Sequence, residues 1–267
     1  MAKATRRVWW GDYKATEYAK IDPEKTIAVL PLAAIEQHGP HLPVSTDTSI
    51  MQGMLETVIA KLPANLDIRI LPIQSVGKSN EHLYAPGTLT LSPLAAVQSW
   101  AELGASVARA GVRKIVFVNS HGGNEEMMGI VTRELRVAFN MLAVKTSWSR
   151  FGTPAGLYSD AENRYGIHGG DLETSLMLHF RPELVDMKQA KDFRSNVEKA
   201  EKTFDLLRHT GTHAFAWIAT DLNPAGVVGN AAAATREKGR VTATYQADGF
   251  VALLKDVAKA RLKDWLK

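Results

Sequence analysis

The segment IEQHGPHLPVSTDT, residues 35–48, concentrates side chains that bind metal ions. It contains Glu36, His38 and Asp47, separated by two prolines and a glycine. In an extended strand, side chains two positions apart face the same side, so Glu36 and His38 can point into one cavity. Asp47 stands just before a predicted helix, where an acidic residue also has an ordinary role as a helix cap or first-turn acid.

Two further clusters have the same character. In VNSHGGNEE, the apolar run KIVFV leads to Asn119 and His121, and two glycines allow a ligand to approach the backbone closely. In HGGDLETS, His168 ends a loop and Glu173 lies in the first turn of the next helix. Each cluster alone is also explained as structure, since isolated histidines are commonly structural and first-turn acids favour helices. Together, at the ends of successive strand–helix units, the three clusters predict one metal site.

The available ligands define the chemistry of such a site. The sequence has no cysteine, which excludes disulfides and thiolate-bound metals and leaves nitrogen and oxygen ligands, suited to zinc, manganese or iron as one ion or as two neighbouring ions. Two ions about 3.5 to 4 Å apart would lower the pKa of a shared water toward 7 and present it as hydroxide to a carbonyl carbon. If the bond is an amide, the leaving amine needs a proton, and His168 is suited to supply it.

The elements that position these residues alternate along the chain. The apolar runs TIAVLPLAA, DIRILPIQS, KIVFVNS and MLAVKTSW predict strands. Between them, helix patterns run from about Thr46 to Leu62, from Ser92-Pro93 and from near Asn124, with Ser92 as a capping residue before a first-turn proline. This order predicts an α/β fold of one domain over residues 1–267, with a mostly parallel sheet and helices on both faces. Metal ligands at strand ends would then meet at the carboxyl edge.

The second half of the chain is less regular. Residues 150–168 form a long predicted loop rich in glycine and aromatic residues, a candidate wall of the active site. Residues 211–230 predict a strand and turns that lead into an alanine run and the last helix. The basic stretch KDVAKARLKDWLK, residues 255–267, predicts an amphipathic helix that closes the domain.

Composition restricts the partners and the location. With 267 residues, 45% hydrophobic and 22% charged, the chain is an ordinary globular protein with a net charge of +4. Its bases are spread out rather than gathered into one stripe, so we expect no nucleic acid partner. No apolar stretch is long enough to cross a membrane and the N-terminus lacks the apolar core of a secretory signal, which predicts a cytoplasmic protein that does not bind membranes.

The motifs together resemble the creatininase family of metal-dependent amidohydrolases. The resemblance rests on LPLAAIEQHGPHLPVSTDT, GKSNEHLYAPGTLTLS, VNSHGGNEE, HGGDLETS and GVVGNAAAATREKG, which span residues 30–239. It implies a three-layer α/β/α fold, a binuclear metal centre, hydrolysis of a C–N bond in a small, non-peptide amide, cyclic amides included, and a homo-oligomer, namely a hexamer. Carried over by position, it implies Glu36, His38, Asp47 and His121 as metal ligands, with Asp47 as the bridge, and His168 as the proton donor.

The sequence also departs from creatininase itself. Creatininase has a glutamate two positions after the third-strand histidine, and Gly123 stands there in an HGGN form. Glu173 matches the glutamate of the family's HAGxxETS motif, so the resemblance implies it as the remaining carboxylate, with a catalytic as well as a ligand role, and Glu125 is the alternative. Ile167 and NRYG replace the glutamate and the tryptophan with which creatininase holds its ring, so we predict a different amide substrate.

Several assignments complete the prediction. Candidate substrate-binding residues are His82, Asn124, Trp148 and Tyr165, although a hydrogen-bonded loop histidine explains His82 equally well. Structural or surface roles are predicted for His41, His179, His209 and His213. The alternative functions are another two-metal hydrolase, namely a phosphoesterase or a small peptidase, and a metal-binding homologue without catalysis. No phosphate-binding loop of the Walker type supports the phosphoesterase, and the presence of His168 argues against a non-catalytic protein.

Overall fold

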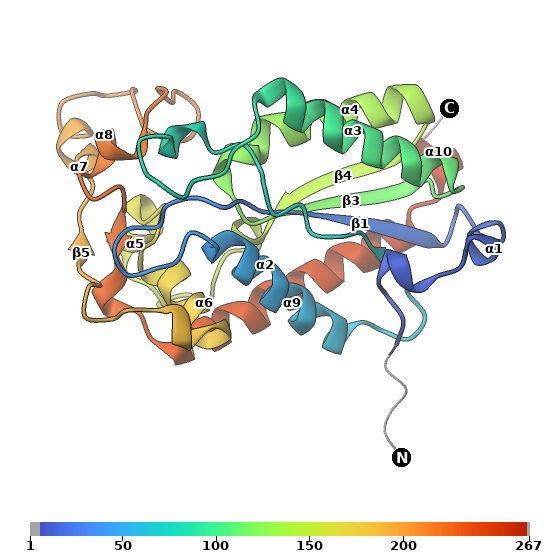
Figure 1. Ribbon diagram of the computed structural model, residues 1–267, viewed down its shortest axis with the longest axis horizontal. Coiled ribbons are helices and arrows are strands. Elements are labelled where there is room, and N and C mark those ends of the chain that lie inside the picture. The colour runs from blue at the N-terminus through green and yellow to red at the C-terminus, as the bar shows by residue number, and fades with distance from the viewer. Residues whose placement is uncertain (1–5, 266–267) are drawn as a thin grey trace, which may run out of the picture.

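The computed structural model describes residues 6–265 of the chain. A four-stranded sheet lies between two layers of helices, and the irregular second half of the chain gathers at one end of the sheet (Figure 1). This arrangement confirms the predicted three-layer α/β/α fold with a mostly parallel central sheet. Within residues 6–265, no helix combines the length and the apolar character that crossing a membrane requires.

All four strands of the central sheet are parallel. They are β1 (Thr26–Leu32), β2 (Asp67–Ile70), β3 (Lys114–Asn119) and β4 (Leu142–Ser147), in the order β2-β1-β3-β4. The chain passes from β1 to one side and returns to β3 on the other, so the topological switch point lies between these strands. Leu32, Asn119 and Ser147 are in register at the carboxyl edge. The segments that follow β1, β3 and β4 therefore leave the sheet side by side.

The two faces of the sheet are covered by different helices. On one face pack α2 (Thr46–Lys61), α6 (Asp171–Phe180) and α9 (Arg236–Lys259), and on the other α3 (Pro93–Arg109) and α4 (Glu125–Phe139). Ile27 and Val29 of β1 belong to the first core, whereas Ala28 and Leu30 belong to the second. Every residue of β1 is buried, as expected for a central strand of a parallel sheet.

The helix starts follow the predicted signals closely. The side chain of Ser92 accepts a hydrogen bond of 3.2 Å from the backbone N–H of Ala95, which caps α3 ahead of Pro93. Helix α2 begins at Thr46, so Asp47 is a first-turn residue and not the cap. Strand β1 ends at Leu32, so Glu36 and His38 lie beyond the regular strand. They nevertheless point into one site.

Short elements make up the rest of the described chain. They are α1 (Ala15–Tyr18), α5 (Asp160–Tyr165), α7 (Val197–Ala200), α8 (Ala219–Leu222) and α10 (Leu262–Trp265), with β5 (Asp192–Phe193) antiparallel to β6 (Gly229–Asn230). Two small hydrophobic clusters hold the segment between β5 and β6. One contains Phe193, Val227 and Ala231, and the other Val197, Leu222 and Val228.

Two predictions about the second half need correction. The strand expected within residues 211–230 is reduced to the two residues of β6, because Pro224 and Gly226, with φ +68°, interrupt the extended backbone. The helix expected over residues 255–267 is divided, since α9 ends at Lys259 and α10 begins at Leu262. Residues 266–267 of that prediction lie outside the described part of the chain.

Candidate metal centre and substrate cavity

The five predicted metal ligands converge at the carboxyl edge of the sheet. Glu36 and His38 follow β1, His121 follows β3, Asp47 lies in the first turn of α2 and Glu173 in the first turn of α6. Glu36, His38 and Asp47 are 1% exposed and His121 is 6% exposed. The switch point between β1 and β3 therefore carries a buried cluster of carboxylates and imidazoles.

Within this cluster the ligand atoms form two groups that share Asp47. His38 Nε2 lies 3.7 Å from Asp47 Oδ1 and 3.8 Å from Glu173 Oε2. His121 Nδ1 lies 3.5 Å from Asp47 Oδ2 and 3.1 Å from Glu36 Oε1. Asp47 thus presents one oxygen to each group, and ligand atoms of His38, Asp47 and Glu173 all lie within 4.8 Å of one another.

Backbone carbonyls orient the two histidine rings. His38 Nδ1 lies 3.0 Å from the carbonyl oxygen of Glu36, and His121 Nε2 lies 2.9 Å from that of Lys78. Because a carbonyl only accepts, the N–H of each of these ring nitrogens donates to it, and the other nitrogen of each ring faces the carboxylates. Histidines that bind metals in proteins are commonly held in this way.

The electrostatics of the cluster call for a cation. Glu36 Oε2, His38 Nε2 and Asp47 Oδ2 are buried without a hydrogen-bond partner among the described residues. Burial and the neighbouring Glu36 raise the pKa of Asp47 well above its usual value. Burial alone would lower the pKa of His121, but Glu36, Asp47 and Glu81 outweigh it and raise this pKa to about 10. Nitrogen and oxygen ligands in this arrangement fit zinc, manganese or iron.

Glu81 is a member of the cluster that sequence reasoning missed. It lies in the short 3-10 helix Asn80–His82, with Oε1 3.5 Å from His121 Nε2, and it forms a further possible ligand set with Glu36 and His121. A Cβ atom at Gly123 would collide with Glu81 Oε1. The space beside Gly123 is thus filled by a carboxylate from another segment. The signal in the sequence was its position next to His82 in SNEH.

His168 lies against the cluster in a stack of three imidazoles. Its ring centroid is 4.2 Å from that of His38 and 4.4 Å from that of His82. His168 Nε2 donates to the carbonyl oxygen of Gln37 at 2.8 Å, so Nδ1 faces Glu36 Oε1 at 3.6 Å. Burial lowers the pKa of His168, and it lowers the pKa of His82 to about 3. The side chain of Gln37 fixes His82 through a contact of 3.0 Å to Nδ1.

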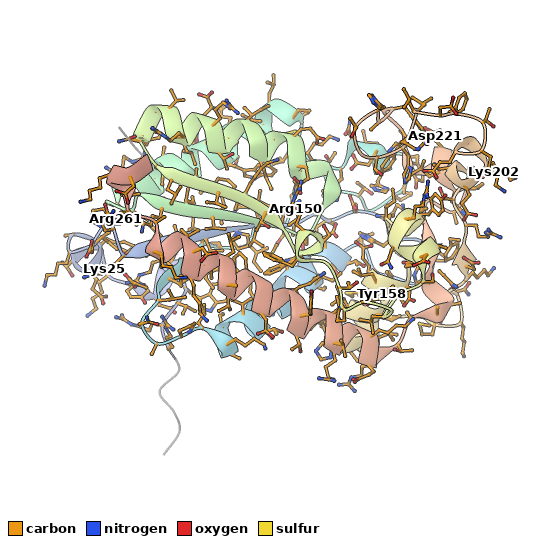
Figure 2. All side chains as sticks on the ribbon, turned by 180° about the vertical axis from the view of Figure 1, so that it is seen from behind. Lys25, Arg150, Tyr158, Lys202, Asp221 and Arg261 are labelled. Carbon is orange, nitrogen blue, oxygen red and sulfur yellow. The ribbon has the colours of Figure 1, made fainter. Side chains whose placement is uncertain are left out.

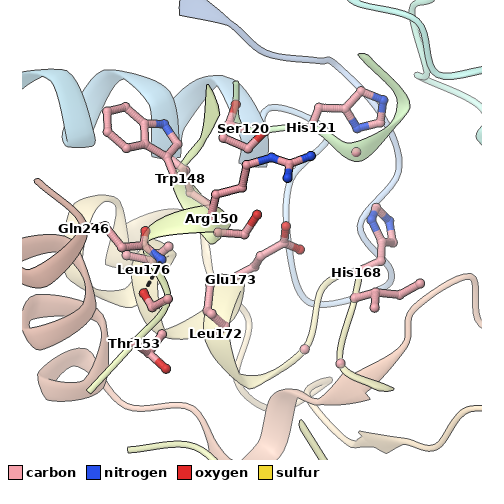
Figure 3. A pocket seen from close by; sticks show the side chains of 18 of the residues that line it. Ser120, His121, Trp148, Arg150, Thr153, His168, Leu172, Glu173, Leu176 and Gln246 are labelled. Carbon is pink, nitrogen blue, oxygen red and sulfur yellow. Dashed lines mark hydrogen bonds between the residues drawn. The ribbon is translucent and has the colours of Figure 1, made fainter. Parts of the chain in front are cut away.

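A cavity of about 670 Å³ opens beside the cluster. Figure 3 shows His121, His168 and Glu173 directed into it, together with Trp148 and Arg150 from the segment after β4. Residues 152–170 supply a further part of the wall, which agrees with the role predicted for residues 150–168, although that loop contains helix α5. Sequence reasoning missed Arg150, which appears in the sequence as an ordinary charged loop residue.

The structure brings one of the four predicted substrate-binding residues to the cavity. Trp148 lines it, whereas His82, Asn124 and Tyr165 do not. The side chain of Asn124 holds the backbone of Ala33 and Lys78, and the hydroxyl of Tyr165 donates to Glu201 at 2.8 Å. These contacts correct the prediction, because local hydrogen bonds turn both side chains away from the cavity. The ring of His82 packs against that of His168 and forms one end of the imidazole stack.

Glu125, the alternative metal ligand, is engaged elsewhere. It accepts hydrogen bonds from Ser147 Oγ and, at 3.0 Å, from Arg150 Nη2, and Lys145 Nζ lies 3.5 Å away. Burial would raise the pKa of Glu125, but the bonds from Ser147 and Arg150 outweigh it and lower this pKa. Glu173, in contact with His38, is the better placed carboxylate.

The histidines predicted to be structural lie outside the possible ligand sets of the described chain. They are His41, His179, His209 and His213. His41 is buried, and its Nε2 lies 3.0 Å from both the carbonyl oxygen of Gly169 and the hydroxyl of Thr174, which ties the segment after β1 to the start of α6. His209 stacks on Tyr165 with ring centroids 6.4 Å apart.

Sequence comparison relates the chain to proteins with named activities. A mycofactocin precursor peptide peptidase of Mycobacterium ulcerans (strain Agy99) is 32% identical over 217 residues, which cover 79% of this chain and 78% of that protein. A creatinine amidohydrolase of Pseudomonas putida is 30% identical over 205 residues, covering 70% of this chain and 77% of that protein.

Solved structures agree with the sequence relatives. A manganese form of creatininase and a mutant creatininase of the Zn-Zn type share the fold, each with a TM-score of 0.74 and 23% identity, covering 96% of this chain and all of theirs. The family described as "Creatininase: Creatinine amidohydrolase" matches residues 11–254, nearly the whole chain. With its fold, its cluster of ligands and this match, the chain belongs to the creatininase family.

Proposed function

We propose that this creatininase-family amidohydrolase cleaves the C–N bond of a small amide at a centre of two divalent ions. The observation that carries the proposal is the pair of histidine–carboxylate groups that share Asp47 beside the cavity. His38, Asp47 and Glu173 would hold one ion, and Glu36, Asp47 and His121 the other. Zinc and manganese are the first metals to test, since similar structures are described as forms with these metals.

The ions and the residues have separate tasks in this proposal. Bound there, two divalent ions would supply an activated water and a Lewis acid for the carbonyl oxygen. Glu36, Asp47 and Glu173 would balance their charge, and the carbonyls of Glu36 and Lys78 would keep the two histidine rings in the tautomers that turn Nε2 of His38 and Nδ1 of His121 toward the ions.

His168 is the proposed proton donor to the leaving nitrogen. Its Nε2 hydrogen is held by the carbonyl of Gln37, and its lowered pKa leaves Nδ1, the atom that faces the cluster, unprotonated at rest. Nδ1 would therefore first accept the proton that the attacking water loses and then pass it to the leaving nitrogen. An amine leaves poorly unless it is protonated, and a positioned general acid contributes about 10²- to 10⁴-fold to the rate. Glu173 contacts His38 and lines the cavity, which supports a ligand role at its open side.

A peptidase is the second candidate, favoured by two observations. The relative from Mycobacterium ulcerans is named a precursor peptide peptidase. The cavity of about 670 Å³ also falls within the size range of sites for drug-sized ligands and has room for a dipeptide-sized group. In this case the same residues cleave a peptide bond, and the chemistry at His168 is unchanged. The predicted hexamer, the single domain and the cytoplasmic location stay predictions.

The test combines a metal count with a substrate screen. Elemental analysis after gentle purification is expected to find two equivalents of divalent metal, and less than one equivalent after reconstitution would contradict the two-ion centre. A mass-spectrometric screen of formamides, lactams, cyclic amides and short peptides should then reveal a hydrolysed amide. Turnover of phosphate esters alone would support the phosphoesterase. Two bound metals with no turnover of any compound would support a homologue without catalysis.

A further inference from the structure

Arg150 lies in the cavity with most of its hydrogen-bonding capacity unused. It belongs to the 3-10 helix Trp148–Phe151 directly after β4, and it is seen from behind at the end of that strand in Figure 2. Its Nη2 donates to Glu125 Oε2 at 3.0 Å, which fixes one side of the guanidinium. Among residues 6–265, Nε and Nη1 have no hydrogen-bond partner, and the side chain is 58% exposed. An anchored guanidinium with free donors is suited to hold an oxyanion.

The charges around Arg150 leave it unneutralised. Glu125 lies between two cations, because Lys145 Nζ is 3.5 Å from the same Oε2 atom. The three groups together carry one positive charge. The other acids of the cavity wall, Glu162 and Glu173, accept the backbone N–H groups of Asn230 and Gly169, and neither forms an ion pair with Arg150. Within residues 6–265, no lysine or arginine other than Arg150 lines this cavity.

The position of Arg150 relative to the metal cluster follows from a chain of contacts. Glu125 contacts Ser147 Oγ, which lies 3.4 Å from Asn119 Nδ2, and that amide donates to the carbonyl of His121 at 2.5 Å. Glu125, Ser147 and Asn119 therefore connect Arg150 to His121, a proposed metal ligand. Arg150 and His121 line the same cavity (Figure 3). Leu172, Leu176 and Trp148 line the cavity as well and offer apolar surface.

We infer that Arg150 binds a carboxylate of the substrate, so that the amide cleaved belongs to an acyl amino acid or a short peptide with a free carboxyl group. The inference rests on the proposed function and names its substrate class. A carboxylate offers two oxygens in one plane, which suit the Nε and Nη1 donors of Arg150 that have no partner among residues 6–265. A phosphate dianion would need a second cation. The apolar residues would contact the carbon skeleton that joins the carboxylate to the amide.

The test separates binding from turnover. Benzoate, benzyl alcohol and phenylphosphonate have no bond for this enzyme to cleave, and their binding to the metal-loaded protein is measured by calorimetry. Arg150→Gln should weaken benzoate binding about 10- to 100-fold, the usual range for a charged hydrogen-bonded pair, and leave benzyl alcohol unchanged. Arg150→Lys should weaken benzoate binding by an intermediate factor, because lysine keeps the positive charge but lacks the paired, planar N–H donors of arginine.

Lys145→Gln is the matched control. It removes the same charge from beside the same carboxylate, but Lys145 does not line the cavity. We expect a change of less than about threefold in benzoate binding. The metal content of all variants is checked, since an unchanged content shows that the site is intact. Equal effects of Arg150→Gln and Lys145→Gln, or none, would overturn the inference. Tighter binding of phenylphosphonate than of benzoate, lost in Arg150→Gln, would assign the site to phosphate instead.

Turnover then tests the substrate class on a matched pair. An N-acetylated dialanine with a free carboxyl group should be cleaved at a higher kcat/KM than its carboxamide, and Arg150→Gln should remove that preference. Equal cleavage of both by the wild-type protein would refute the inference and leave the proposed hydrolysis standing. If neither is cleaved and Arg150 still governs benzoate binding, the carboxylate site stands and this hydrolysis fails.

Discussion

Replacing Asp47 by asparagine should have opposite effects on stability with and without metal. The substitution keeps the shape of the side chain and removes the charge that both histidine–carboxylate groups share. In the metal-free protein, burial and Glu36 raise the pKa of Asp47, so the folded state disfavours the ionised group. Asp47→Asn removes this cost, and the metal-free variant should be at least as stable as the metal-free wild type.

The magnitude with metal follows from the number of sites. One site with free metal at 100 times its Kd stabilises the folded state by about 2.7 kcal/mol. Two sites therefore contribute about 5 kcal/mol, and with roughly 2–4 °C of Tm per kcal/mol for a protein of this size, chelation should lower the wild-type Tm by about 10–20 °C. Asp47→Asn should show almost none of this shift because both ions lose a ligand. His38→Ala, which affects one group, should keep about half.

Differential scanning fluorimetry with and without a chelator, paired with elemental analysis, measures these effects. Asp248→Asn is the control, because it makes the same chemical change at a surface residue paired with Lys61, and its chelation shift should equal that of the wild type. A wild-type shift in Asp47→Asn, with both ions still present, would refute the bridging role of Asp47. Loss of one ion only would place Asp47 in a single site.

Three further predictions concern the site. Creatinine turnover should be poor or absent, because Ile167 and the NRYG stretch replace the groups that hold its ring in creatininase, and a direct assay with creatinine decides this. His168→Ala should keep both metals and lose about 10²- to 10⁴-fold in amide turnover, but much less on an ester whose leaving group needs no proton, so equal losses would assign His168 to positioning. Gly123→Ala should reduce metal content, because its Cβ would collide with the ring of His121. Gly122→Ala is the control, since a Cβ there meets no atom within 4 Å and should leave the metal content unchanged. Equal metal content in the two variants would contradict this prediction.

The sequence predicted the regular half of the fold and singled out the side chains that cluster at the candidate metal centre. Strand and helix periodicity located β1 to β4 and the starts of α2 and α3, because hydrophobic patterning and capping residues act locally. The spacing of three clusters singled out Glu36, His38, Asp47, His121, His168 and Glu173 as residues at the ends of strand–helix units, and the resemblance to the creatininase family supplied their predicted roles.

The residues that were missed depend on contacts between distant segments. Glu81 contacts His121 at the edge of the sheet. It fits there because Gly123 has no Cβ to occupy the same space. Arg150 is a candidate binding residue because Glu125 anchors it and because it lines the cavity. A local sequence pattern shows neither the anchor nor the cavity. Tyr165 looked suitable for substrate binding by type and position, but its hydrogen bond to Glu201 turns it away. Side-chain direction outside regular elements is set by such tertiary contacts.

The small clusters between β5 and β6 have a consequence for local unfolding. Each joins three buried apolar residues, whereas the strands β1 and β3 are held by two large cores and by continuous hydrogen-bonded ladders. A segment with so little buried apolar surface opens at a lower free energy than the sheet. Amides of residues 195–225 should therefore exchange with deuterium well before those of β1. Since Thr210 of this segment lines the cavity, local opening there would widen the cavity while the sheet and the site residues that it carries stay folded.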